Sequence, residues 1–100
     1  MMKFPNKLGL IIEADNNEKR PNLLKKLTNP KFMMPNTFTA GEVLQLLRQR
    51  LELHKEEGLV LFANGRYILK PSQKLEDVYM KYKDEDGFLY LTYSEEQVFG

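Results

Sequence analysis

The chain has 100 residues, a net charge of +1 at pH 7 and no cysteine. This length predicts one domain over residues 1–100, and the balanced charge gives no strong field that would attract nucleic acid. The lack of thiols excludes disulfides, thiolate metal sites and a cysteine nucleophile. No apolar run approaches the roughly 20 residues that span a bilayer, and no signal peptide opens the chain. We therefore expect a cytoplasmic domain.

Two short strands are predicted in the first third of the chain. The apolar run at 8–12 is followed by polar residues, which is typical of a strand that leads into a loop. Residues 31–34 predict a second strand, closed by Pro35. Because proline cannot donate to a hydrogen-bond ladder, this strand is expected either to lie at an edge of the sheet or to stop at Pro35.

The long helix has the clearest signal. Thr39 and Glu42 have the spacing of a capping box, in which each side chain bonds to the backbone of the other. Apolar residues recur at helical spacing over 43–51, and this pattern predicts a helix that ends near Leu53.

The second half predicts two further strands and a short helix. Residues 58–63 form an apolar run, and the Asn-Gly pair at 64–65 predicts a tight turn. Ser72 is expected to cap a short helix, residues 88–93 to form the last strand, and residues 94–100 to form a flexible tail. This element order predicts an α+β fold, the β-grasp of ubiquitin, with a four-stranded mixed sheet packed on one main helix.

The last two strands carry apolar side chains on both faces, although a single helix can cover only one. One set faces the helix: Leu59, Leu61, Leu89 and Leu91. The alternating set is Val60, Phe62, Phe88 and Tyr90. This second face is either an interaction surface, open to self-association, or is covered by the tail or by residues 23–27.

Several segments carry a specific resemblance: FPNK at 4–7, KFMMP at 31–35, RQRL at 48–51, KDEDGFLY at 83–90 and TYSEEQVFG at 92–100. In sequence and order they resemble the autophagy ubiquitin-like modifiers, the family of light chain 3 and the GABA-receptor-associated protein. Members of that family carry two additional helices before the first segment. Here only Met1 and Met2 precede Lys3, so we expect this chain to lack those helices.

The resemblance implies that Gly100 is the conjugation site. In the family, a cysteine protease exposes this glycine, and activating and conjugating enzymes pass its carboxylate to phosphatidylethanolamine on autophagosomal membranes. A residue without Cβ suits a narrow enzyme channel. The modifier itself would be no enzyme and would need no cofactor or metal. The lone His54 and the adjacent Asp84, Glu85 and Asp86 are interpreted as surface groups.

The resemblance also implies a groove for cargo receptors and adaptors that carry an aromatic residue and, three positions later, an aliphatic one. Such a peptide would add a strand to the edge at 31–34. The aromatic pocket would be lined by Ile11, Lys31, Met33 and Phe88. The aliphatic pocket would be lined or rimmed by Phe32, Met34, Pro35, Phe38, Val43, Leu46, Leu47 and Arg50, although the helical apolar residues also fit a plain core role. Two alternatives stay open: a peptide-binding module that is never lipidated, and a modifier conjugated to protein lysines.

Overall fold

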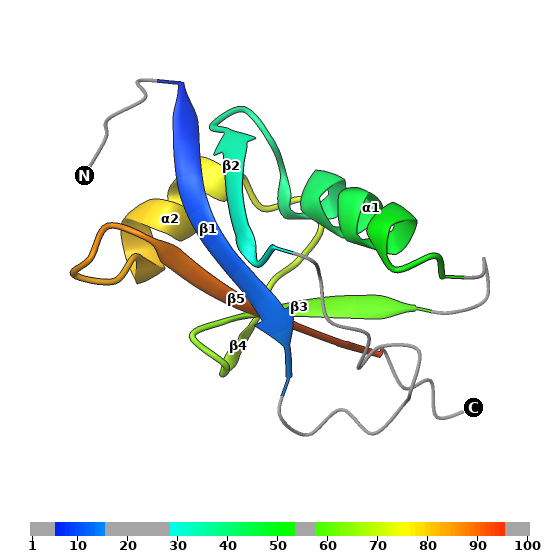
Figure 1. Ribbon diagram of the computed structural model, residues 1–100. Coiled ribbons are helices and arrows are strands. Elements are labelled where there is room, and N and C mark those ends of the chain that lie inside the picture. The colour runs from blue at the N-terminus through cyan, green and yellow to red at the C-terminus, as the bar shows by residue number, and fades with distance from the viewer. Residues whose placement is uncertain (1–5, 16–28, 54–57, 96–100) are drawn as a thin grey trace.

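A five-stranded mixed sheet and two helices make up the fold of the computed structural model, which describes residues 6–15, 29–53 and 58–95 (Figure 1). The elements are β1 Lys7–Ala14, β2 Lys31–Pro35, α1 Ala40–Arg50, β3 Leu59–Ala63, β4 Tyr67–Ile68, α2 Leu75–Tyr82 and β5 Leu89–Glu95. The strand order is β2-β1-β5-β3-β4. β1 runs antiparallel to β2 and parallel to β5. The predicted α+β β-grasp is confirmed, and β2 lies at an edge as predicted.

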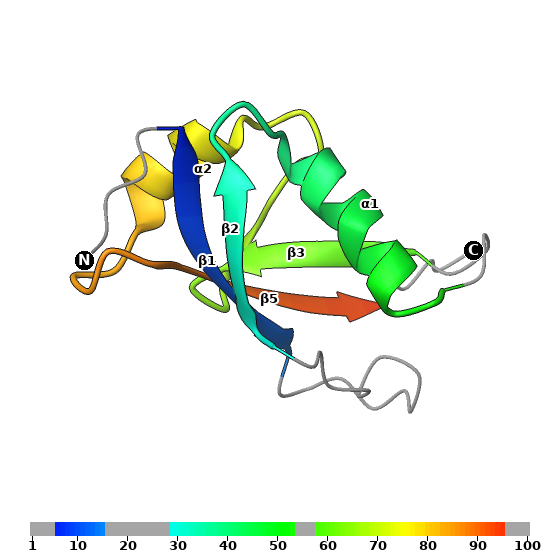
Figure 2. The same cartoon turned by 45° about the horizontal axis from the view of Figure 1, so that its top comes forward.

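The core lies between the sheet and α1. Every second residue of β1, β3 and β5 points to this side, because successive strand side chains alternate between faces. Val43 and Leu47 of α1 are fully buried there. The buried strand residues are Leu10, Ile12, Met34, Leu59, Leu61, Ala63, Leu89, Leu91 and Tyr93. Figure 2 shows α1 and β2 on the same side of the molecule, with β2 lying along β1 at the sheet edge.

The opposite face carries the second apolar set, as predicted. Val60 and Phe62 are half-buried, and Tyr90 stays 37% exposed. The register places Ile68 beside Phe62, and Ile68 is 64% exposed. The apolar surface on this face therefore continues onto β4.

Three features of these elements differ from the prediction. The sheet has five strands, because β4 follows the tight turn at 64–65, where Asn64 and Gly65 have φ of 53° and 69°. α1 ends at Arg50, with Leu51 as its C-cap. The last strand continues through Ser94 and Glu95, which had been assigned to the tail, because both pair with β3.

The predicted cap of the short helix was wrong. α2 begins at Leu75 with Lys74 as N-cap, and no side chain caps it. The Leu75 N–H donates instead to the carbonyl of Phe38, at 2.8 Å. A backbone carbonyl that is distant in the sequence thus accepts the hydrogen bond that the Ser72 side chain was expected to accept.

Candidate functional site

Two hydrogen bonds that flank the β1–β2 pairing show which backbone groups of β2 are hydrogen-bonded to β1. The Ile12 N–H donates to the Pro30 carbonyl at 2.9 Å, and the Asn36 N–H donates to the Asn6 carbonyl at 2.9 Å. In an antiparallel pair, hydrogen-bonded positions recur every second residue. The even-numbered residues of β2 therefore face β1, and the odd-numbered ones direct their N–H and C=O groups away from the sheet.

The outward groups at the two ends of β2 are already used. The Lys31 N–H donates to Oδ1 of Asn29 at 3.0 Å. The Pro35 carbonyl accepts from the Phe38 N–H at 3.1 Å. Among the residues that the structure describes, no partner is seen for the carbonyl of Lys31 or for the N–H and carbonyl of Met33. These groups are spaced to pair with one further strand.

On the sheet face away from α1, the predicted aromatic-pocket residues lie together. The Lys31 Nζ is 5.0 Å from the centroid of the Phe88 ring. Phe88 lies against Gly9, since a Cβ built on Gly9 would be 2.8 Å from its Cε1 and 3.8 Å from the Met33 sulfur. Ile11 pairs with Lys31 on this same face. Gly9 was missed by the sequence analysis, although a glycine inside a strand often marks such a close approach.

On the α1 side, the predicted aliphatic-pocket residues divide into accessible and buried ones. The Arg50 guanidinium is 5.9 Å from the centroid of the half-buried Phe32 ring. Met34 is 3% exposed, and Val43 and Leu47 are fully buried. Because Met34, Val43 and Leu47 are buried, they do not line a pocket at the surface but lie beneath the residues that do.

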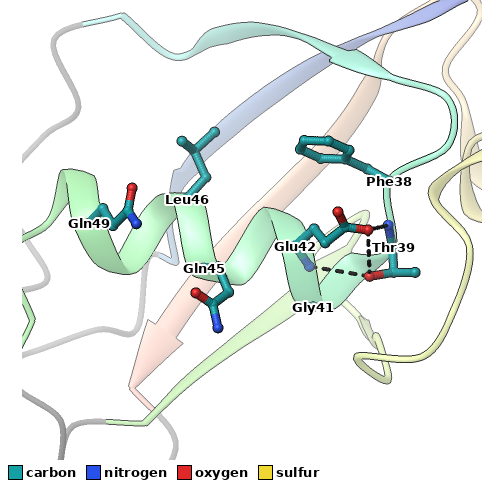
Figure 3. Close-up of a pocket in the computed structure, with 7 residues that line it drawn as sticks. All are labelled: Phe38, Thr39, Gly41, Glu42, Gln45, Leu46 and Gln49. Carbon is teal, nitrogen blue, oxygen red and sulfur yellow. Dashed lines mark hydrogen bonds between the residues drawn. The ribbon is translucent and has the colours of Figure 1, made fainter.

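A shallow groove runs along the outer side of α1 (Figure 3). Phe38 and Leu46, both predicted site residues, point into the space between α1 and β2 in this view. The groove is also lined by residues that were not among the predicted site residues: Thr39, Gly41, Glu42, Gln45 and Gln49. Their helical spacing was visible in the sequence, but their position beside Phe38 follows from the fold.

The turn before β5 holds Phe88 in place. The Phe88 N–H donates to Oδ1 of Asp86 at 2.8 Å, and the Tyr90 hydroxyl donates to Oδ2 of the same carboxylate. The bond from Tyr90, and then that from Phe88, lower the pKa of Asp86 below its usual value. The Tyr79 hydroxyl donates to the Gly87 carbonyl and ties this turn to α2.

Two of the singled-out residues, His54 and the conjugation candidate Gly100, lie outside the described residues. Within the described ranges, no cluster of acidic or histidine side chains is arranged to hold a metal ion. Neither of the two helices described is long and apolar enough to cross a membrane.

The model of the family described as "Autophagy protein Atg8 ubiquitin like" matches residues 1–100. The chain belongs to this Atg8 ubiquitin-like family. It is 35% identical to human microtubule-associated protein 1 light chain 3 gamma, covering 98% of this chain and 65% of that relative. It is 36% identical to Arabidopsis thaliana autophagy-related protein 8e, covering 98% of this chain and 76% of that one.

The crystal structure of Trypanosoma brucei ATG8 is similar to this fold. It superposes with a TM-score of 0.82 and 38% sequence identity, covering 96% of this chain and 78% of that one. The resemblance inferred from the sequence motifs is thereby confirmed. The chain is an autophagy ubiquitin-like modifier, and its relatives are modifiers rather than enzymes.

Proposed function

We propose that this modifier is conjugated through Gly100 to phosphatidylethanolamine and recruits cargo receptors and adaptors to the membrane through the open edge of β2. The conjugation half rests on family membership and on the TYSEEQVFG ending. β5 ends at Glu95, so Gly100 lies five residues beyond the last strand position. Five residues can span at most about 17 Å, which is enough for Gly100 to enter an enzyme's channel while the domain stays outside it.

The observation that carries the recruitment half is the pair of outward backbone groups on Met33 at the β2 edge. A peptide strand that pairs with them gains main-chain hydrogen bonds that do not depend on its sequence. Specificity then has to come from the side chains on either face of the added strand.

The spacing of the motif supports a site with one pocket on each face of the added strand. Residues three apart on a strand point to opposite faces, because side chains alternate. An aromatic residue would meet Ile11, Met33 and Phe88 on the face away from α1. The aliphatic residue three positions later would turn to the other face and enter the groove between Phe38 and Leu46. The Lys31 and Arg50 cations would meet acidic residues of the motif.

A double-mutant cycle tests the groove. We expect an acidic aromatic-x-x-aliphatic peptide to bind in a calorimetric titration, and its affinity to fall when either anchor is replaced by alanine. Phe38→Ala should weaken binding of the peptide that keeps its aliphatic anchor, and should have less effect on the peptide that lacks it. Because the same folded variant is used in both titrations, its own stability cancels. Equal losses for the two peptides would place the aliphatic anchor elsewhere.

A further inference from the structure

The side of the β2 edge that faces α1 carries opposite charges at its two ends. Arg50, at the last turn of α1, stacks over Phe32 near the start of β2. Glu42, in the first turn of α1, lines the groove beside Phe38, just beyond the end of β2. α1 therefore runs back along β2 and carries a cation near the start of β2 and a carboxylate just beyond its end.

Only one of the two oxygens of the Glu42 carboxylate takes part in the capping box. Its Oε1 accepts from the Thr39 N–H at 3.0 Å and from the Thr39 hydroxyl at 3.3 Å. No hydrogen bond or ion pair joins Oε2 to another group in the described part of the chain. Figure 3 shows the carboxylate directed toward Phe38, at the mouth of the groove. Lys74 bridges to Thr39 through its backbone, but no ion pair joins it to Glu42 within the described residues.

The start of α1 offers no competing site for an anion. A helix N-terminus binds an anion mainly by donating hydrogen bonds from amides that have no other partner. Here the Ala40 N–H donates to the Gln73 carbonyl and the Gly41 N–H to the Pro71 carbonyl, each at 2.9 Å. The Glu42 N–H donates to the Thr39 hydroxyl at 3.3 Å. The charged group that lines this end of the groove is therefore the Glu42 carboxylate.

We propose that Glu42 makes the groove select peptides with basic residues directly after the aliphatic anchor. This inference rests on the proposed peptide groove. A peptide whose aromatic anchor lies near Lys31 and whose aliphatic anchor lies near Phe38 runs parallel to β2. Its next residues then leave past Glu42, where a lysine or arginine is attracted and a carboxylate is repelled. Gln45 and Gln49 line the same groove and add hydrogen-bonding amides without charge.

Titrations with three peptides test this preference for basic residues. The peptides share both anchors and the acidic residues before the aromatic anchor. They differ only in the two residues after the aliphatic anchor, which are Lys-Lys, Gln-Gln or Glu-Glu. At low salt we expect wild type to bind the Lys-Lys peptide about threefold to tenfold more tightly than the Glu-Glu peptide, the scale of exposed ion pairs. The ratio should shrink at high salt, because exposed charges are screened. Glu42→Gln should remove most of the ratio while keeping the helix, since glutamine also serves in a capping box.

Glu76→Gln is the matched control, because Glu76 is an exposed first-turn acid on the other helix, and it should keep the wild-type ratio. Equal binding of the Lys-Lys and Glu-Glu peptides to wild type, or an unchanged ratio in Glu42→Gln, overturns the inference and leaves the groove standing. Failure of all three peptides to bind overturns the proposed groove itself.

Discussion

The Nζ atom of Lys31 lies 5.0 Å from the centroid of the Phe88 ring, so the edge strand β2 and the residue before β5 form one surface. The Cδ1 and Cε1 atoms of that ring lie against Gly9 of β1. A cation over an aromatic face is attracted to it, and this contact holds the Lys31 side chain close to the proposed aromatic pocket. Lys31 is therefore placed to attract an acidic group of a peptide whose aromatic ring contacts Phe88.

Reversing the groove's two cations should weaken binding of an acidic motif peptide. We expect Lys31→Glu and Arg50→Glu each to lower affinity several-fold at low salt, because repulsion replaces attraction. The loss should diminish as salt is raised, since both side chains are exposed. Lys81→Glu makes the same change in net charge on α2 and should bind like wild type. A loss just as large in Lys81→Glu would mean that overall charge, rather than the groove, governs binding.

Adding a single methyl group at Gly9 should disturb the aromatic pocket. A Cβ there would lie 2.8 Å from Cε1 and 2.9 Å from Cδ1 of Phe88, so the ring has to move. We expect Gly9→Ala to lower peptide affinity about 2- to 10-fold, the scale of a partly lost aromatic contact. Thermal melts and titrations of the same preparation separate folding from binding. Unchanged affinity would show that a peptide's aromatic residue does not rest on Phe88.

The two faces of β3 should respond oppositely to substitution. Leu61 is fully buried, so Leu61→Ala should cost about 2–5 kcal/mol in unfolding free energy. Phe62 lies half-buried on the opposite face beside exposed Ile68, and Phe62→Ser should cost less while reducing self-association. Denaturant melts and light scattering measure both effects. An unfolded Phe62→Ser together with a silent Leu61→Ala would reverse the assignment of the faces.

The turn that holds Phe88 should depend on pH through Asp86. Its folded pKa is lowered, so its stabilising contribution is present above the ordinary value of 3.8 and is lost as pH falls through the folded pKa. Tyr90→Phe removes the largest cause and should raise the Asp86 pKa toward 3.8 in a carboxyl NMR titration. Tyr82→Phe is the control, because no hydrogen bond of the Tyr82 hydroxyl is seen among the described residues. An unmoved Asp86 titration in Tyr90→Phe would contradict this account.

Features set by a few neighbouring residues were predictable from the sequence. The capping box of Thr39 and Glu42 is present with both of its bonds, and the turn residues Asn64 and Gly65 both have positive φ. Such local chemistry depends little on the rest of the fold. The edge position of β2 was also predictable, because Pro35 cannot donate to a ladder.

Features that depend on contacts between residues far apart in the sequence were not predictable from the sequence. β4 has only two residues, too few to show an alternating pattern. The carbonyls of Pro71 and Gln73 cap the first amides of α1, so the segment that was expected to start α2 at Ser72 serves the other helix instead. Likewise, the groove role of Gln45 and Gln49 follows from where Phe38 lies, which their spacing alone does not reveal.

In the proposed function, one chain both binds a peptide at the β2 edge and is attached to a membrane through Gly100. Flotation of phosphatidylethanolamine liposomes tests this directly, after incubation with the chain, activating and conjugating enzymes, nucleotide and a fluorescent acidic aromatic-x-x-aliphatic peptide.

Wild type should carry the peptide into the liposome fraction. Deletion of Gly100 should leave the peptide in solution, although the deleted chain still binds it there with wild-type affinity, because a terminal residue adds little to the folded domain. Lys31→Glu should be conjugated normally but carry less peptide. Equal peptide in the liposome fraction with wild type and with the Gly100 deletion would contradict the account.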